Sequence, residues 1–322
     1  MTRNTAEKWD IGERAGLVGI GTHKLWLHVS GPDRKPKAPV VIIIQGLASS
    51  EKGWAAVERL LSPTIRVYAY ERSGYGESEP SPDPPTATTI AHELDLLVKR
   101  ARISPPYVIV AHSWGGILSR EFLALRPNDV AGMVFVEANQ EHTLEILDWR
   151  QPALAVMQVG VDSITATGLT KTNQLTPEEW QLYRATESSS AFQKQAAVEF
   201  AEYPKGFQIL GSKGQLYQDP PFLGTRPVCV TKGDNRADLQ KLYDAGVTLG
   251  NGNATEREAY LEILRTWDEK DRALQSEILS LSSTGRYLES PKGAGHNVQL
   301  THPETIVEGV QWVLSQLQGD NC

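Results

Sequence analysis

The segment 107–125 constrains the fold more than any other part of the chain. It starts with the apolar and β-branched run Tyr-Val-Ile-Val-Ala, passes through His-Ser-Trp-Gly-Gly, and continues with apolar residues at helical spacing. The first run predicts a strand buried on both faces, and the last stretch predicts a helix. Ser113 would then lie on a tight turn between the two, where the neighbouring side chains have to be small.

This turn matches the G-x-S-x-G pattern of a nucleophile elbow, with Ala111 in the first glycine position. Such a turn holds a serine hydroxyl out at the top of a sheet, beside the positive end of a helix. The alternative is an ordinary strand-to-helix turn that happens to contain a serine, because short glycine motifs occur by chance. Partner residues later in the chain favour the first interpretation.

Strands and helices alternate through much of the sequence. This alternation is typical of right-handed crossovers in a parallel sheet that helices cover on both faces. The stretch 139–224 has helical patterns but no clear strand, so we expect one α/β domain with a core of residues 1–139 and 226–322 and a helical cap of residues 140–225. The patterns predict strands at 40–44, 65–70, 107–111, 134–136, 226–231 and 286–288, an edge hairpin within 19–29, and helices at 54–61, 88–101, 117–125, 256–281 and 306–317.

Composition and charge limit the possible partners and compartments. The chain has 32 basic and 39 acidic residues, and its net charge of −7 disfavours nucleic acid and offers no polybasic membrane anchor. Residues 1–14 lack the apolar region of a secretory signal, and the longest apolar run, residues 40–44, is too short to span a bilayer. Cys229 lies in an apolar run and Cys322 ends the chain, so we expect a buried thiol rather than a disulfide. These features indicate a cytoplasmic protein, and a homodimer remains an open possibility.

His296 is the strongest candidate for a general base. It follows the glycines of Gly-Ala-Gly, after a predicted strand and before the last helix, in a loop that can carry the ring to a distant serine. An imidazole titrates near neutral pH, so it can take the serine proton and return it to a leaving group. His112 directly precedes Ser113, so we expect its side chain to point away and pack. No pair of histidines has metal-ligand spacing with an acidic neighbour, so no metal site is expected.

Two carboxylates compete for the role of orienting that base. Glu137 ends the strand that follows the elbow helix, 24 residues after Ser113, which would place it at the same edge of the sheet. Asp234 follows the later strand, which is the other position where such an acid can lie. We favour Glu137 because it follows its strand without an intervening loop, whereas Asp234 precedes Asn235 in a pattern typical of a turn.

Two backbone N–H groups are candidates for an oxyanion hole. One belongs to Trp114, directly after Ser113, and the other to Leu47, in the loop after the strand 40–44. Gln45 is a candidate for contacting the substrate or for bracing this loop, although it is equally consistent with a polar residue at the end of a strand.

Together these residues resemble the α/β-hydrolase superfamily. The resemblance rests on Ile-Gln-Gly at 44–46, the segment Tyr-Glu-Arg-Ser-Gly-Tyr-Gly-Glu-Ser at 70–78, the elbow, the strand 134–137 and the closing His296. It implies an eight-stranded, mostly parallel sheet flanked by helices, with a helical cap inserted between the strand ending at Glu137 and the one starting near Arg226. Members with the acid at the earlier strand include lactone hydrolases and, with an aspartate nucleophile, haloalkane dehalogenases.

The chain departs from the common family pattern at three positions. Gln45 stands where histidine is usual, Ala111 replaces a glycine, and Arg236 occupies the position of the later acid in many members. The last departure favours Glu137. A serine at position 113 argues against dehalogenase and epoxide-hydrolase chemistry, because those enzymes use aspartate there.

Aromatic residues are concentrated in the cap. They would suit a medium-sized hydrophobic ester or lactone, with Trp149, Trp180 and Tyr183 as candidates for contacting it, although rings that merely pack the cap give the same pattern. No cofactor is needed. The alternatives are a prolyl-aminopeptidase-like or carbon–carbon bond hydrolase, and a ligand-binding receptor or non-hydrolytic biosynthetic enzyme on the same fold. The cap aromatics are Trp149, Trp180, Tyr183, Phe192, Phe200, Tyr203, Phe207, Tyr217 and Phe222.

Overall fold

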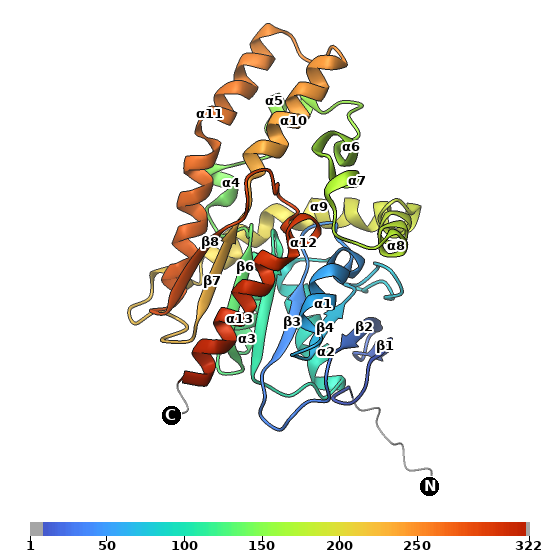
Figure 1. Ribbon diagram of the computed structural model, residues 1–322, viewed down its shortest axis with the longest axis vertical. Coiled ribbons are helices and arrows are strands. Elements are labelled where there is room, and N and C mark those ends of the chain that lie inside the picture. The colour runs from blue at the N-terminus through green and yellow to red at the C-terminus, as the bar shows by residue number, and fades with distance from the viewer. Residues whose placement is uncertain (1–8, 320–322) are drawn as a thin grey trace.

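An eight-stranded sheet forms the centre of the molecule (Figure 1). The computed structural model describes residues 9–319, so Cys322 and most of the N-terminal stretch considered above lie outside the described residues. The strand order is β1-β2-β4-β3-β5-β6-β7-β8. The strands are β1 (Arg14–Gly19), β2 (Lys24–Ser30), β3 (Val40–Ile44), β4 (Val67–Tyr70), β5 (Tyr107–His112), β6 (Val130–Val136), β7 (Val228–Lys232) and β8 (Gly285–Glu289).

Pairing divides the sheet into a hairpin edge and a parallel centre. Strand β1 pairs antiparallel with β2, and β2 pairs antiparallel with β4, whereas the pairs from β4 through β8 are parallel. Every residue of β3 and β5 is buried, as the continuous β-branched runs predict for strands covered on both faces. The expected mostly parallel, eight-stranded sheet is confirmed.

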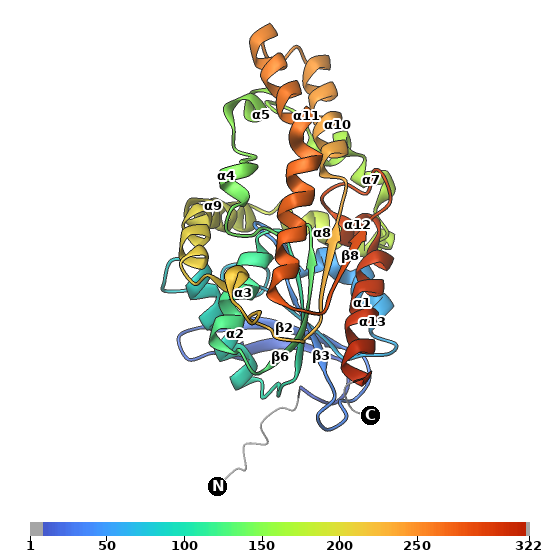
Figure 2. The same cartoon turned by 90° about the vertical axis from the view of Figure 1, so that its left-hand side faces the viewer.

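Helices cover both faces of this sheet (Figure 2). Alternate residues of β3 point to opposite sides, so Val41 and Ile43 pack in one apolar cluster and Ile42 and Ile44 in another. The first cluster contains side chains of α1 and α13, and the second contains side chains of α2 and α3. These helices are α1 (Ala55–Leu61), preceded by the 3₁₀ turn η1 (Glu51–Trp54), and α2 (Ala87–Arg100), α3 (Gly115–Leu125) and α13 (Pro303–Gly319), the last preceded by α12 (Val298–Thr301).

Most of the remaining helices lie above the carboxyl ends of the parallel strands, whereas the 3₁₀ turns η2 and η3 pack in the core beside the sheet (Figures 1 and 2). Most of them fall between β6 and β7, as expected for the stretch without strands, but α10 and α11 follow β7 and also rise away from the sheet. They are α4 (Thr143–Ile146), α5 (Pro152–Met157), α6 (Ser163–Thr167), α7 (Leu169–Thr172), α8 (Pro177–Glu187), α9 (Ser190–Gly211), η2 (Gln215–Tyr217), α10 (Asn235–Thr248), α11 (Ala254–Glu277) and η3 (Ile278–Leu281).

Helices α10 and α11 pack with the start of the expected cap. Leu154 and Met157 of α5 share an apolar cluster with Leu242 of α10 and with Tyr260 and Trp267 of α11. The helical layer above the sheet therefore includes helices before β7 and helices after it. The sequence patterns predict a cap of residues 140–225 alone. We refer below to the helices α4–α11 as the cap. Within residues 9–319 no helix combines the length and the apolarity that crossing a bilayer requires.

Candidate active site

The register of three parallel strands brings Ser113, Glu137 and Gly233 to adjacent positions. His112 pairs with Val136, and Val136 pairs with Thr231, so each of these strands ends at nearly the same level. The Ser113 N–H donates to the Val136 carbonyl at 3.1 Å, and the Glu137 N–H donates to the Thr231 carbonyl at 2.8 Å. The sheet itself therefore sets the spacing between the serine and the carboxylate.

Ser113 occupies a strained turn between β5 and α3. Its φ is +52°, a left-handed value that non-glycine residues rarely adopt and that marks functional turns. A Cβ atom at Gly115 would lie 2.3 Å from the Ile44 carbonyl, so only glycine lets the start of α3 approach β3 this closely. A Cβ at Gly46 would lie 2.9 Å from the Cβ of Ser113, which places the loop after β3 directly beside the serine.

Glu137 connects the imidazole of His296 to the backbone after β7. Its φ is +46°, and its side chain is buried. The His296 Nδ1–H donates to Oε2 of Glu137 at 3.4 Å, and the Gly233 N–H donates to Oε1 at 2.5 Å. A carboxylate only accepts hydrogen bonds, so the Nδ1 atom of His296 carries the hydrogen and the Nε2 atom of the neutral ring is left as an acceptor.

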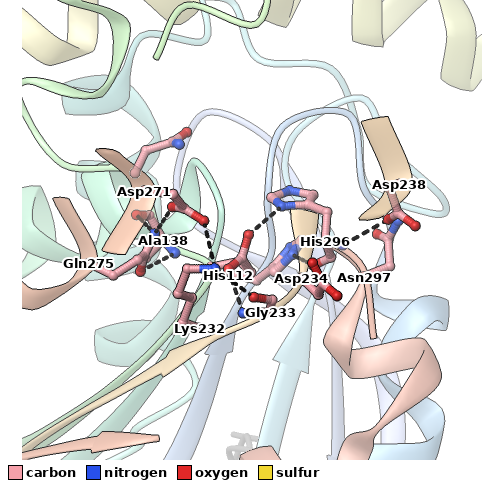
Figure 3. Close-up of polar contacts among 12 residues, drawn as sticks. His112, Ala138, Lys232, Gly233, Asp234, Asp238, Asp271, Gln275, His296 and Asn297 are labelled. Carbon is pink, nitrogen blue, oxygen red and sulfur yellow. Dashed lines mark hydrogen bonds and ion pairs between the residues drawn. The ribbon is translucent and has the colours of Figure 1, made fainter. Parts of the chain in front are cut away.

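Two further side chains hold the loop that carries His296 (Figure 3). Asp238 accepts the His296 N–H at 2.9 Å through Oδ2, and His112 donates its Nε2–H to the His296 carbonyl at 3.0 Å. The ring centroids of His112 and His296 lie 4.7 Å apart. Burial, together with the nearby charge of His296, lowers the pKa of His112 to about 3, so His112 is neutral at physiological pH and acts as a donor to the loop.

The pKa of His296 is raised above 6.5, its ordinary value. Burial on its own would lower it, but the hydrogen bond and the negative charge of Glu137 outweigh burial, and the carboxylates of Asp238 and Asp271 add to the effect. The same interactions stabilise the imidazolium form that a general base adopts after it has taken a proton.

Asp234, the alternative acid, lies away from the imidazole. Its Oδ2 atom accepts the Gly293 N–H at 2.8 Å, and its Oδ1 atom accepts the Ala237 N–H at 3.3 Å as the N-cap of α10. Both contacts are with backbone groups, as in the turn interpretation of this residue. The structure therefore places Glu137, rather than Asp234, beside His296.

A second buried carboxyl, that of Asp271 on α11, is close enough to Glu137 to be affected by its charge, and it lies beside Gln275 (Figure 3). Its Oδ2 atom is 3.3 Å from Nζ of Lys232, and Gln275 donates to its Oδ1 atom at 3.4 Å. Burial and the charge of Glu137 raise the pKa of Asp271 to about 7. Gln275 also exchanges two hydrogen bonds with the backbone of Ala138, which fixes α11 to the chain directly after Glu137.

A cavity of about 450 Å³ opens over this cluster, between the edge of the sheet and the cap. Ser113, Glu137 and His296 all line it, as does Leu47. Five aromatic rings line the rest of the wall together with aliphatic and polar side chains, and the Trp149 Nε1–H donates to the Tyr203 hydroxyl at 3.2 Å. The rings that line the cavity are those of Trp149, Tyr183, Phe200, Tyr203 and Trp267.

The other residues predicted from the sequence lie close to this cavity or beneath it. The backbone N–H of Trp114 is at the N-cap of α3, and its indole ring is fully buried. Gln45 is fully buried, does not line the cavity, and donates to the Tyr70 carbonyl at 2.8 Å. Trp180 does not line the cavity either, and its ring packs 5.4 Å from that of Tyr183.

Asp238, Asp271 and Gln275 are site residues that the sequence patterns do not indicate. All three lie on α10 or α11, and no sequence signal connects these helices to the site. Asp238 follows Asp234 by one helical turn, and Gln275 follows Asp271 by one turn, so each pair shares a helix face. This spacing of four residues indicates a polar helix face, but it does not show which part of the protein that face contacts.

One group of potential metal ligands is present within the described residues. His28, Glu51 and Glu58 offer ligand atoms within 4.8 Å of one another, at a different place from the cavity. Protein nitrogen atoms already contact these carboxylates, since Lys52 pairs with Glu51 at 2.5 Å and His28 with Glu58 at 2.9 Å.

Known proteins resemble this chain over nearly its whole length. The family profile for the alpha/beta hydrolase fold matches residues 39–303. A protein from Gibberella zeae called "AB hydrolase superfamily protein" is 36% identical over 95% of this chain and 98% of its own length. A protein from Hormonema carpetanum named "Probable transporter efuK" is 30% identical over 96% of this chain, which spans only 44% of that relative. Among solved structures, haloalkane dehalogenase DbeA from Bradyrhizobium elkani superposes with a TM-score of 0.61, at 16% identity, over 96% of this chain and all of its own, a likeness of fold.

Proposed function

Because the chain belongs to the α/β hydrolase family, we propose that it is a serine hydrolase that cleaves a carboxylic ester or lactone of a medium-sized hydrophobic molecule. One observation carries this proposal. Ser113 on its strained turn, His296, and the carboxylate that engages His296 Nδ1 all line the same cavity. One fold can carry enzymes of different chemistry, so these residues, rather than the fold, support a particular reaction.

In the proposed reaction, Ser113 Oγ attacks the carbonyl carbon of the substrate while His296 Nε2 takes the hydroxyl proton. Glu137 stabilises the resulting imidazolium through Nδ1. The protonated ring then gives its proton to the leaving alcohol oxygen, and an acyl-enzyme remains on Ser113. Water, deprotonated by the same Nε2 atom, attacks the acyl carbonyl, and the imidazolium returns this proton to Ser113 Oγ as the carboxylic acid leaves.

The negative charge that develops on the carbonyl oxygen needs two hydrogen-bond donors. The proposed donors are the backbone N–H groups of Leu47 and Trp114. The Leu47 residue lines the cavity, and the Trp114 N–H lies at the start of α3, where the helix dipole favours negative charge. Removing one donor of this kind costs about 3 kcal/mol of transition-state stabilisation.

The cavity wall supports a hydrophobic substrate without negative charge. Its volume of about 450 Å³ is in the range of small-molecule sites, and five aromatic rings and six aliphatic side chains contribute apolar surface to its wall. Among the described residues that line it there is no lysine or arginine, whereas four carboxyl groups line it, those of Glu137, Glu187, Asp238 and Asp271. A substrate carboxylate would therefore find no lysine or arginine in the described wall.

Labelling and turnover together test this proposal. We expect a fluorophosphonate to label Ser113 stoichiometrically, and p-nitrophenyl butyrate to be hydrolysed with steady turnover. The Ser113→Ala variant should lose both activities. Ser119→Ala is a matched control, because Ser119 is a buried serine of α3 whose hydroxyl donates to the Gly116 carbonyl. Labelling without turnover of any ester would contradict the hydrolase and favour a receptor or a non-hydrolytic enzyme.

A further inference from the structure

A buried ion pair joins the cap to the core beside Ser113. Glu199 lies on α9, and Arg72 lies in the loop after β4, 127 positions earlier. The Arg72 Nε–H donates to Glu199 Oε1 at 2.7 Å, and Nη2 donates to Oε2 at 2.9 Å. Both side chains are only 1% exposed. The Tyr75 hydroxyl donates to the same carboxylate at 2.9 Å, so this carboxylate is fixed from several directions.

This pair is bonded to the loop that carries Leu47. Arg72 donates to the carbonyls of Gln45 at 3.2 Å and Gly46 at 2.8 Å. Glu199 Oε2 accepts the Ala48 N–H at 3.1 Å. The loop is therefore held at its carbonyl side by Arg72 and at its N–H side by Glu199. A second cap carboxylate, Glu187 of α8, accepts the Ser50 N–H at 3.0 Å further along the same loop.

The geometry of one peptide unit links these contacts to the proposed oxyanion site. The Gly46 carbonyl and the Leu47 N–H belong to the same trans peptide, in which the two groups point in opposite directions. Arg72 fixes the carbonyl, so it also fixes the direction of the Leu47 N–H. Ala48, the next residue, has a φ of +47°, a strained value that its hydrogen bond to Glu199 helps to maintain.

The opposite charges of Arg72 and Glu199 stabilise each other in the buried pair. Burial would lower the pKa of Arg72, but the charge of Glu199 outweighs burial and raises it, so Arg72 stays a cation. A buried carboxylate without this cation would be strongly disfavoured, and so would the cation without the carboxylate. Neutralising Glu199 therefore disturbs the hydrogen bonds that Arg72 makes to the loop.

We propose that Glu199 and Arg72 are positioning residues that aim the Leu47 N–H at the substrate oxyanion. A helix of the cap would then set the catalytic geometry of the core in addition to roofing the cavity. This inference rests on the proposed serine hydrolase function. Neither residue touches the substrate in this scheme, since neither of them lines the cavity.

The test compares Glu199→Gln with Glu202→Gln. The second variant removes the same charge from the same helix, but among the described residues the ion-pair partner of Glu202 is the exposed Lys205 rather than a core residue. For p-nitrophenyl butyrate we expect Glu199→Gln to lower kcat about tenfold to a hundredfold with KM changed less than threefold, because removing an oxyanion donor outright costs about a hundredfold or more. Glu202→Gln should behave as the wild type.

A second readout separates oxyanion geometry from a general loss of structure. An alkyl trifluoromethyl ketone adds to Ser113 and places an oxyanion where the ester places one in the transition state. Its inhibition constant should rise in Glu199→Gln by about the same factor as kcat falls. Unchanged kcat in folded Glu199→Gln, or a raised KM with unchanged kcat and inhibitor affinity, would overturn the inference.

The Tyr75→Phe variant tests the same inference if Glu199→Gln does not fold. It removes one donor to Glu199 and leaves the ion pair with Arg72 in place, and we expect a smaller loss, of about threefold to tenfold, in kcat and in inhibitor affinity together. Wild-type kinetics in the folded Tyr75→Phe variant would then count against the inference. The wild type serves as the reference for the function itself: if it neither turns over the ester nor reacts with a fluorophosphonate, the hydrolase proposal fails, and the inference fails with it.

Discussion

His296 Nδ1 lies 3.4 Å from Oε2 of Glu137, a residue 159 positions earlier in the chain. The other oxygen of this carboxylate accepts the Gly233 N–H at 2.5 Å. Glu137 is thus held by the backbone on one side and faces the imidazole on the other. This arrangement fixes which nitrogen of the ring carries the hydrogen and leaves Nε2 free to act as a base.

Truncating the two candidate acids should have very different effects on catalysis. We expect Glu137→Ala to lower kcat about a thousandfold or more, because the imidazolium loses its stabilising charge and its orientation. Asp234→Ala should lower kcat much less, because within the described residues the Asp234 side chain accepts hydrogen bonds from the Gly293 and Ala237 backbone N–H groups and not from His296. Steady-state kinetics on an uncharged ester measures both, with a thermal melt to confirm folding. A larger loss in Asp234→Ala would overturn the assignment.

The acid limb of the pH profile should report the pKa of His296. Because Glu137 raises this pKa above 6.5, kcat/KM of the wild type should fall as the pH drops through a midpoint above 6.5. In Glu137→Gln the carboxylate charge is gone, burial dominates, and the midpoint should move to lower pH. The profile is measured from about pH 5 to about pH 9 with an uncharged ester. A midpoint that Glu137→Gln leaves unchanged would show that another group controls this limb.

Glu187 should make the stability of the folded protein depend on pH. Burial at the cavity wall raises the pKa of its carboxyl from 4.5 to about 7, despite the hydrogen bonds from Ser50. The folded state thus binds this proton more tightly than the unfolded state. Between pH 4.5 and about 7 the penalty for the buried charge grows, and above about 7 it is complete.

Glu187→Gln should therefore raise the melting temperature, relative to the wild type, more at about pH 8 than at about pH 4.5. Melts followed by circular dichroism at the two pH values test this. Glu178→Gln is the control, since Glu178 is an exposed residue of the same helix and its substitution should show no such pH dependence. An equal gain at both values would mean that the charge of Glu187 does not weaken the folded state.

The substrate should be selected against negative charge. Because carboxyl groups but no lysine or arginine line the described cavity, we expect p-nitrophenyl hydrogen adipate, an anion, to have a kcat/KM about tenfold or more below that of its methyl ester. A tenfold gap is about 1.4 kcal/mol. The hydroxide-catalysed rates of the two esters correct for their intrinsic reactivity. Equal corrected values would show that the wall does not discriminate by charge.

The sequence predicts the core of the fold well because its signals are local. The β-branched run 40–44 becomes β3, buried at each position, and the turn at Ser113 has the strained backbone that its small neighbours indicate. The predicted start of β4 is less accurate, because a strand is predicted for residues 65–70 and the structure has a strand from Val67. Ile65 is buried in the apolar cluster that contains side chains of α1, so its apolar character extended the pattern beyond the strand.

The cap is harder to predict from the sequence. The pattern at 256–281 predicts a long helix, and α11 is one, but the pattern does not say that its apolar face packs on α5 or that Trp267 lines the cavity. Trp180 is a candidate for the cavity wall only because aromatic residues are concentrated in 140–225. In the structure its ring packs against that of Tyr183. An apolar face requires a partner, but it does not specify which one.

The sequence by itself determined the strands, the elbow and the residue types able to carry the chemistry, because periodicity and glycine placement act over a few residues. Only the tertiary structure decided which carboxylate faces His296, and that Glu199 meets Arg72 beside the loop of Leu47. Those contacts join residues more than a hundred positions apart. They depend on strand register and on how the cap seats on the sheet, and both follow from packing of the whole chain.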